Sequence, residues 1–137
     1  MIPKFRAWTE EGKVMYYDVY HFKDDILLLS YDEIAFDEVP ASDFILMQST
    51  GLKDKNDKEI YECDIVKFSD CDDDVYVTPV VWDNNYACFG VSFSGKYPIS
   101  FDYLEEFYTE LKDIEVIGNI WEDGELLEGE YNGRTTC

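Results

Sequence analysis

The feature that most constrains the fold is the segment Leu46–Phe68, in which two apolar runs flank a short stretch of turn-forming residues. The first run ends at Thr50-Gly51, and Asp54–Asp57 then supplies Asp, Lys and Asn without any apolar residue. Asp and Asn favour turns because their side chains hydrogen-bond to nearby backbone groups. Apolar residues resume at Ile60, and Ile65–Phe68 begin a new strand. The segment therefore predicts a strand, a solvated turn and a second strand in succession.

A hairpin is predicted at the start of the chain. Lys4–Trp8 and Val14–Tyr17 are short runs in which apolar residues recur, and Thr9–Lys13 between them is turn-like. Gly12 offers this turn a residue that adopts positive φ angles without strain.

Residues 18–43 carry weaker signals. Residues 18–25 predict an irregular connection. Ile26–Leu29 are four aliphatic residues in a row, which fit either a strand buried on both faces or one turn of a buried helix. Residues 30–43 are acidic and include Pro40, so they also predict a connection, which leads into a strand at Phe44–Gln48.

A second hairpin is predicted in the middle of the chain. Val75–Asp83 and Tyr86–Phe93 are rich in β-branched and aromatic residues, which favour strands. Asn84-Asn85 between them predicts a two-residue turn, because Asn tolerates the left-handed region. Pro79 indicates an edge strand or a bulge, because proline donates no backbone hydrogen bond.

One helix and one closing strand complete the pattern. Ser100 is placed to cap a helix over Phe101–Tyr108, in which Tyr103, Leu104 and Phe107 share a face. Ile114–Trp121 predicts the last strand.

These elements predict a mainly β fold with one short helix. Several short antiparallel strands followed by a helical turn and a closing strand are typical of an SH3-like barrel, here assigned to residues 44–122. Residues 1–43 are predicted to form an N-terminal β hairpin and extension packed on the barrel. Residues 123–137 are predicted to form an acidic C-terminal tail.

The net charge limits the kinds of partner that this protein is expected to bind. The chain carries 31 Asp and Glu against 11 Lys and Arg, for a formal net charge of -20, and the acids are spread evenly along it. Direct binding to nucleic acid or to an anionic membrane needs clustered basic residues, which the sequence lacks. A basic protein partner is favoured, although net charge alone also fits a simple role in solubility.

Cysteines and histidine give no sign of a metal or cofactor. Cys63, Cys71, Cys88 and Cys137 form no C-x-x-C pair, and His21 is the one histidine, so no zinc site and no cofactor are expected. The sequence has no signal peptide or membrane span, which predicts a cytoplasmic protein with free thiols. Cys71 and Cys137 are expected to face solvent, and nearby carboxylates should discourage the thiolate form.

The sequence resembles the YopX family of phage and prophage proteins over most of its length. The resemblance rests on four motifs in matching order: Lys4–Trp8, Leu46–Asp54, Glu59–Val66 and Val116–Glu122. The family pattern has Gly where this chain has Cys63, so the turn there is expected to differ locally, because a positive φ strains cysteine. The resemblance implies an SH3-like barrel and a phage or prophage setting, but no catalytic activity.

Candidate chemistry is sparse. Asp70–Asp74 could ligate calcium or magnesium, but it lacks the ligand spacing and the Gly of an EF-hand, so a solvated acidic turn is favoured. No G-x-S-x-G motif surrounds a serine, and His21 between Tyr20 and Phe22 is better explained as a packed or surface residue. No enzymatic activity is therefore expected, and the carboxylate-based, metal-dependent enzyme is the weakest alternative.

A binding surface is expected instead, because SH3-like barrels often bind peptides in aromatic-lined grooves. The aromatic residues that could line such a groove, or could belong to the core, are Tyr61, Phe68, Tyr76, Trp82 and Trp121. The leading hypothesis is a non-enzymatic acidic protein that imitates nucleic acid and occupies a basic nucleic-acid-binding protein. The alternative is a structural phage protein that forms a symmetric homo-oligomer through strand edges.

Overall fold

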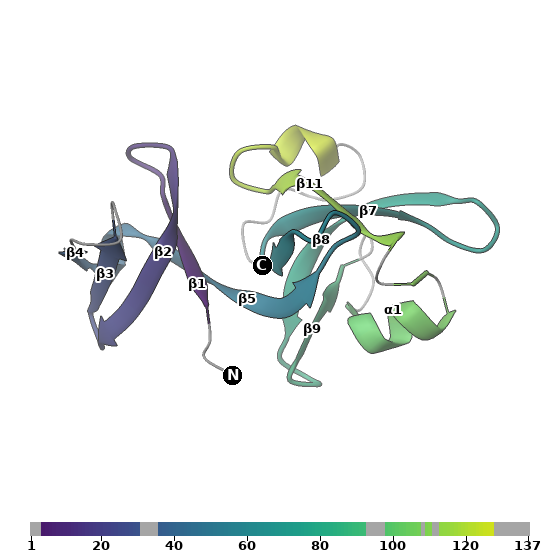
Figure 1. Cartoon of the computed structure of the whole chain (residues 1–137), viewed down its shortest axis with the longest axis horizontal. Coiled ribbons are helices and arrows are strands. Elements are labelled where there is room, and N and C mark those ends of the chain that lie inside the picture. The colour runs from purple at the N-terminus through teal and green to yellow at the C-terminus, as the bar shows by residue number, and fades with distance from the viewer. Residues whose placement is uncertain (1–3, 31–35, 93–97, 108, 111–112, 128–137) are drawn as a thin grey trace. The chain divides into compact units, whose positions relative to one another are not determined.

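The computed structural model describes residues 4–30, 36–92, 98–107, 109–110 and 113–127, without the side chains of Phe22 and Phe107. The chain divides into two units, Met1–Gly51 and Leu52–Cys137. The fold is mainly β, as predicted (Figure 1). Its strands are β1 Phe5–Thr9, β2 Val14–Lys23, β3 Ile26–Ser30, β4 Phe36–Pro40, β5 Ile45–Lys53, β6 Glu59–Tyr61, β7 Asp64–Ser69, β8 Val75–Asp83, β9 Cys88–Val91, β10 Ile99–Ser100 and β11 Glu115–Asn119. Its helices are α1 Phe101–Phe107 and the 3-10 turns Ala41–Asp43 and Gly124–Leu127.

The strands form two antiparallel sheets. The first has the order β4-β3-β2-β1-β5-β6, and the second has the order β10-β9-β8-β7-β11. The division between the units falls within β5, after Gly51, whereas the predicted domain boundary lies just before β5. β5 continues to Lys53, two residues beyond Gly51, where the first apolar run was predicted to end. Gly51 permits this continuation with a φ of 81°. In the described ranges, no helix has the length and apolar character that a membrane span requires.

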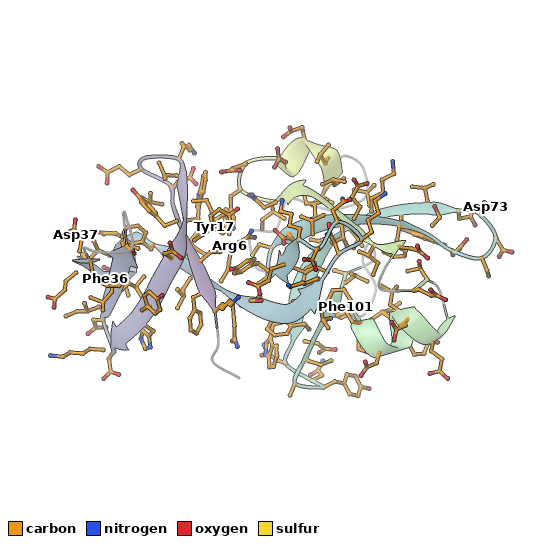
Figure 2. The ribbon with its side chains drawn as sticks, viewed as in Figure 1. Arg6, Tyr17, Phe36, Asp37, Asp73 and Phe101 are labelled. Carbon is orange, nitrogen blue, oxygen red and sulfur yellow. The ribbon has the colours of Figure 1, made fainter. Side chains whose placement is uncertain are left out.

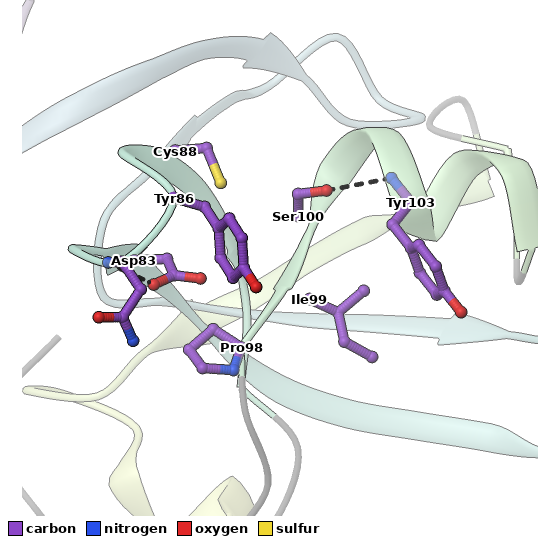
Figure 3. A pocket seen from close by; sticks show the side chains of 8 residues that line it. Asp83, Tyr86, Cys88, Pro98, Ile99, Ser100 and Tyr103 are labelled. Carbon is purple, nitrogen blue, oxygen red and sulfur yellow. Dashed lines mark hydrogen bonds between the residues drawn. The ribbon is translucent and has the colours of Figure 1, made fainter.

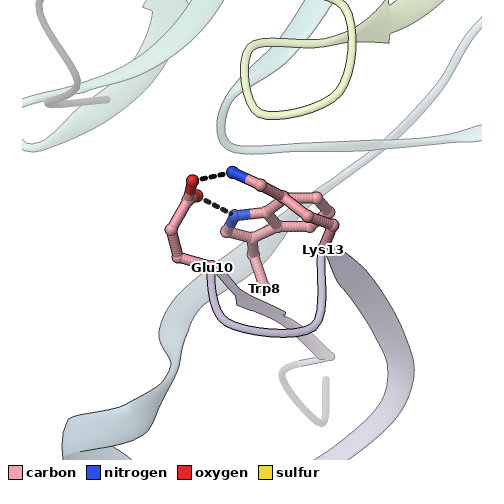
Figure 4. A network of polar contacts seen from close by, with 3 residues as sticks. All are labelled: Trp8, Glu10 and Lys13. Atoms are coloured by element: carbon pink, nitrogen blue, oxygen red, sulfur yellow. Dashed lines mark hydrogen bonds and ion pairs between the residues drawn. The ribbon is translucent and has the colours of Figure 1, made fainter.

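The first unit confirms the opening hairpin. Trp8 pairs with Met15 across β1 and β2, and Lys13, not Gly12, adopts the positive φ of the turn. Glu10 ties the turn to the strand, because it accepts a hydrogen bond from Trp8 Nε1 at 2.9 Å and forms an ion pair with Lys13 (Figure 4). The hydrogen bonds from Lys13 and Trp8 hold the pKa of Glu10 below its ordinary value.

Two predictions for this unit were wrong. The predicted connection at residues 18–25 is mostly strand, because β2 continues to Lys23 and pairs with β3. The predicted connection at 30–43 contains β4, an exposed edge strand that pairs with β3. The core of the unit is made of Ala7, Val19, Leu27 and Leu29, with Phe5, Tyr16, Val39, Ala41 and Phe44 packed against it.

Arg6 of the opening motif Lys4–Trp8 is buried together with the two residues that follow it. It is only 2% exposed, and its guanidinium carbon lies 5.9 Å from the centre of the Tyr17 ring, a cation–π arrangement (Figure 2). Its neighbours Ala7 and Trp8 are also buried. This motif is therefore structural.

The second unit contains the larger core. Residues from β6, β7, β8, β9, α1 and β11, and one residue directly before β11, contribute to it: Ile60, Val66, Phe68, Val80, Val91, Phe101, Leu104, Ile114 and Val116. The predicted helix is confirmed as α1, and Ser100 caps it, since the backbone N–H of Tyr103 donates to Ser100 Oγ at 3.2 Å. The last 3-10 turn buries Leu127, and the rest of the predicted acidic tail lies outside the described residues.

Two predictions for the second hairpin need correction. Asp83 pairs with Cys88, so the connection between β8 and β9 is the four residues Asn84–Ala87, not two. Pro79 lies in a central strand and not at an edge. It is tolerated there because β8 changes partner at this point: Pro79 is paired with Ile65 of β7, and pairing with β9 begins at Val80.

Candidate binding pocket

A partly open cavity of about 740 Å³ lies in the second unit, beside the β8–β9 turn, β10 and the start of α1 (Figure 3). Its volume is within the range of pockets that bind small ligands. The residues that line it are Asp83, Asn85, Tyr86, Cys88, Pro98, Ile99, Ser100 and Tyr103.

The β8–β9 turn builds one wall. Asp83 Oδ1 accepts a hydrogen bond from the backbone N–H of Asn85 at 2.9 Å, which holds the first half of the turn. Ala87 closes the turn with a φ of 50°. The turn presents the ring of Tyr86, which is 80% exposed. A large aromatic side chain that contributes so little to the core is available to a partner.

β10 and α1 build the opposite wall. Ile99 pairs with Val91 and Ser100 pairs with Gly90, and this places β10 against β9. The approach is close because Gly90 has no side chain: a Cβ there would overlap the carbonyl oxygen of Ile99. α1 then presents Tyr103, which is 49% exposed, at the rim of the cavity.

The pocket is negatively charged. Asp83 is only 6% exposed, and its second carboxylate oxygen accepts no hydrogen bond from the residues that the structure describes. Burial raises the pKa of the Cys88 thiol, and the charges of Asp83 and Asp102 raise it further. The thiol is therefore protonated at neutral pH and is not an activated nucleophile.

The aromatic residues predicted to line a binding groove differ in how deeply they are buried. Tyr61 and Phe68 are buried, and Tyr76 stacks on Phe68 with their ring centres 5.4 Å apart. Trp82 is 39% exposed and packs edge-to-face against Phe89 at 4.9 Å. Trp121 is partly buried. Of this set, Trp82 lies nearest in sequence to the pocket, because it directly precedes Asp83.

Sequence reasoning missed the residues that line the pocket. Asp83, Tyr86 and Tyr103 were assigned to a strand end, a strand and a helix face, and no motif connects them. The one available signal was a tyrosine directly after the polar pair Asn84-Asn85, where a turn should expose it.

Asp54, the last residue of the second motif, organises the backbone around it. Asp54 is only 6% exposed, although a solvated turn was predicted there. Its Oδ1 accepts hydrogen bonds from the backbone N–H groups of Asn56 and Lys58, each at 2.9 Å, and its Oδ2 accepts one from Val116 N–H at 2.9 Å. One carboxylate therefore fixes its own turn and joins it to β11.

Two other polar residues of the motifs, Asp64 and Asn119, have the same kind of role. Asp64 Oδ2 accepts a hydrogen bond from Tyr61 N–H at 2.8 Å. Asn119 Oδ1 accepts hydrogen bonds from the backbone N–H groups of Trp121 and Glu122, at 3.0 and 2.9 Å. These residues stabilise turns.

Cys63 occupies the position where the family pattern has glycine. Its φ is 70°, so the backbone keeps the conformation that suits glycine, and cysteine bears the strain. The Cys63 side chain forms a disulfide, whereas Cys71 and Cys88 are free. The expectation of free thiols was therefore wrong at Cys63, and the predicted position of Cys137 lies outside the described residues.

The Asp70–Asp74 loop stabilises itself. Asp70 Oδ1 accepts hydrogen bonds from the backbone N–H groups of Asp72 and Asp74, at 2.9 and 3.0 Å, and Oδ2 accepts one from the Tyr76 hydroxyl at 2.9 Å. Both oxygens of Asp70 are thus engaged within the loop. In the described ranges, no group of three or more His, Cys, Asp or Glu side chains is arranged to hold a metal ion.

Replacing Tyr76 by phenylalanine should raise the pKa of Asp70. Burial alone would raise this pKa, but hydrogen bonds from the Tyr76 hydroxyl and the backbone N–H groups of Asp74 and Asp72 outweigh it and hold the pKa below its ordinary value. Y76F removes one donor and keeps the ring that stacks on Phe68. NMR titration of the carboxyl carbons measures the change, with Glu10 as an internal control.

The pH dependence of this effect has a defined sign. Because the pKa of Asp70 is lower in the folded state, its hydrogen bonds stabilise the fold above the ordinary Asp pKa of about 3.9. That contribution disappears as the pH falls through the folded-state pKa. Y76F should therefore lose stability at neutral pH and lose none in strong acid. An unchanged Asp70 pKa in Y76F would contradict this account.

Comparison with known proteins agrees with this fold. Residues 4–128 match the family described as YopX protein. The crystal structure of protein EF1440 from Enterococcus faecalis is similar, with a TM-score of 0.62 and 28% sequence identity, covering 93% of this chain and 99% of that one. The crystal structure of YopX from Bacillus subtilis gives a TM-score of 0.60 and 27% identity, covering 91% and 98%. No curated protein gives a significant match.

The class defined by these findings is a two-sheet, mainly β protein with an acidic, aromatic-rimmed pocket in its second unit. The chain belongs to the YopX family, which confirms the resemblance noted in its sequence.

Proposed function

We propose that this chain is a phage or prophage protein that acts in the cytoplasm by binding a basic protein partner, and that it is not an enzyme. The observation that carries the proposal is a set of exposed stretches that contain carboxylates and no Lys or Arg. These stretches are Asp72–Asp74 in the β7–β8 loop, Asp102, Glu105 and Glu106 on α1, and Asp37 and Glu38 on β4. Such surfaces attract cations and steer basic partners toward the encounter.

Three of the exposed lysines do little to offset this charge. Lys13, Lys53 and Lys55 already pair with acids of the chain itself: Lys13 with Glu10, Lys53 with Asp57 at 3.6 Å, and Lys55 with Glu115 at 3.5 Å. With a net charge of -20, the surface carries a large excess of carboxylates. The more specific form of the proposal is that this surface imitates a nucleic acid backbone and occupies a DNA-binding protein of the host or the phage.

The test is the affinity for a basic DNA-binding protein across a salt series. Since counter-ions screen exposed charges, binding should weaken by roughly tenfold or more between 50 and 200 mM salt. Titration calorimetry measures this directly. Absence of binding at low salt, or an affinity that does not change with salt, would contradict the proposal.

A homo-oligomer is the second candidate, favoured by one feature of the first unit. Phe36 on the edge strand β4 is 48% exposed and packs edge-to-face with Tyr20, which is 51% exposed. An exposed aromatic pair at an open strand edge could pair with a second copy, although Asp37, Glu38 and Pro40 on the same strand discourage such pairing. Light scattering at micromolar concentration tests it, and an oligomer would become more stable with added salt.

A further inference from the structure

We propose that the pocket beside the β8–β9 turn binds an arginine side chain of the basic partner, with Asp83 as its counter-ion and Tyr86 and Tyr103 as the aromatic surfaces beside it. This inference rests on the proposed function, because it identifies the place where a basic partner is recognised. It also names the chemical group that is read: a planar guanidinium.

Asp83 offers a carboxylate oxygen to the cavity. Asp83 is only 6% exposed as a whole residue, so few water molecules surround it, and a cation that enters the cavity can interact with its carboxylate. Within the residues described, one oxygen accepts a single hydrogen bond, from Asn85 N–H, and the second accepts none. In Figure 3 this second oxygen points toward Tyr86 and the cavity, where a cation from outside could reach it.

Two exposed tyrosines form part of the rim of the cavity. Tyr86 is 80% exposed and Tyr103 is 49% exposed, and they belong to opposite walls of the cavity. Figure 3 places the Tyr86 ring between Asp83 on one side and Ser100 and Ile99 on the other. Arginine stacks on aromatic rings and binds carboxylates through a planar fork, whereas lysine offers a point charge on a flexible chain. The combination therefore favours arginine over lysine.

Carboxylates on α1 and in the pocket give this region a negative charge. Asp102, Glu105 and Glu106 are exposed on α1, which carries no basic residue. Burial raises the pKa of the Cys88 thiol in the pocket, and the charges of Asp83 and Asp102 raise it further. The carboxylates at and near the cavity therefore favour a cationic ligand over an anionic or neutral one.

The experiment uses the full chain and two peptides of equal charge, hexa-arginine and hexa-lysine, titrated by calorimetry. Hexa-arginine should bind more tightly than hexa-lysine, by at least about threefold, because the pocket adds stacking to charge attraction. In NMR spectra, the largest shifts on binding should fall on the backbone amides of Asn85, Cys88 and Ser100.

Two variants and two matched controls locate the site. D83N removes the charge but keeps an oxygen for Asn85 N–H, and Y86A removes a ring that is 80% exposed, so both should fold. Each should weaken hexa-arginine binding by about fivefold to tenfold. The controls are D72N, which removes one exposed charge elsewhere in the unit, and Y20A, which removes a half-exposed ring of the first unit; each should change binding by less than about twofold.

The outcomes separate this inference from the proposed function. If hexa-arginine binds but D83N and Y86A behave like D72N and Y20A, the charged surface attracts cations without this pocket, and the inference is overturned while the proposed function stands. Equal affinity for the two peptides would also overturn it. If neither peptide nor a basic DNA-binding protein binds at low salt, both ideas fail.

Discussion

Replacing Asp54 by alanine is expected to lower the free energy of unfolding by about 3–5 kcal/mol, because three backbone N–H groups lose a charged acceptor. The donors in the turn, Asn56 and Lys58, can turn to water, since both residues are exposed. The N–H of Val116 cannot do so as easily, because Val116 is 8% exposed in the core. Most of the loss should therefore come from the link between the turn and β11.

The conservative variant separates charge from geometry. D54N keeps an oxygen for the turn but places an amide NH₂ against the Val116 N–H, so we expect a loss of about 2 kcal/mol. The matched control is D57N in the same turn, where the residue is exposed, and asparagine tolerates its φ of 64°, so the change should stay within about 0.5 kcal/mol. Chemical denaturation of the three variants provides the measurement. Equal losses for D54A and D57N would show that Asp54 does not organise this turn.

Replacing Gly90 by alanine is expected to destabilise the second unit by about 2–3 kcal/mol, because the new methyl group has no room. It would overlap the carbonyl oxygen of Ile99 and lie 2.7 Å from its carbon and 3.0 Å from the Cα of Ser100. These are backbone atoms, so relief requires β10 to move away from β9. Since β10 and α1 form one wall of the pocket, the variant should also lose affinity for hexa-arginine.

Gly124 is the control for this prediction. A Cβ at Gly124 would meet no atom within 4 Å, and this glycine does not adopt a positive φ, so G124A should leave the midpoint of thermal unfolding almost unchanged. Thermal melts followed by circular dichroism compare the two variants. If G90A melts at the same temperature as G124A, the close approach of β10 to β9 is not part of the fold in solution.

Local signals were enough to predict the elements that depend on them. The opening hairpin has two apolar runs around a polar turn, and α1 has a serine cap with an apolar face, so both were predicted correctly. β4 was missed because an exposed edge strand needs no apolar alternation, and Phe36–Pro40 contains two adjacent acids, Asp37 and Glu38, and a proline. Pro79 was misjudged because the change of strand partner at this residue depends on tertiary pairing.

The site was less predictable than the fold for a related reason. The aromatic residues predicted to line a groove lie in apolar stretches of the sequence, and the same apolar pattern explains why Tyr61 and Phe68 are buried. The pocket instead depends on Tyr86 in a turn and Tyr103 on a helix, which become neighbours only when β10 pairs with β9. No residue spacing in the sequence predicts the pairing of β10 with β9. The turn at Cys63 was expected to differ from the family pattern because a positive φ strains cysteine, but Cys63 keeps a φ of 70°, so this expectation was wrong.

The most direct test of the central claim is a competition experiment. Increasing amounts of this protein are added to a basic DNA-binding protein bound to fluorescent duplex DNA at low salt, and the released DNA is followed by anisotropy. The account predicts full displacement of the DNA, with D83N and Y86A needing severalfold more protein than D72N, and loss of displacement as salt is raised. DNA that stays bound at saturating amounts of the folded protein would contradict it.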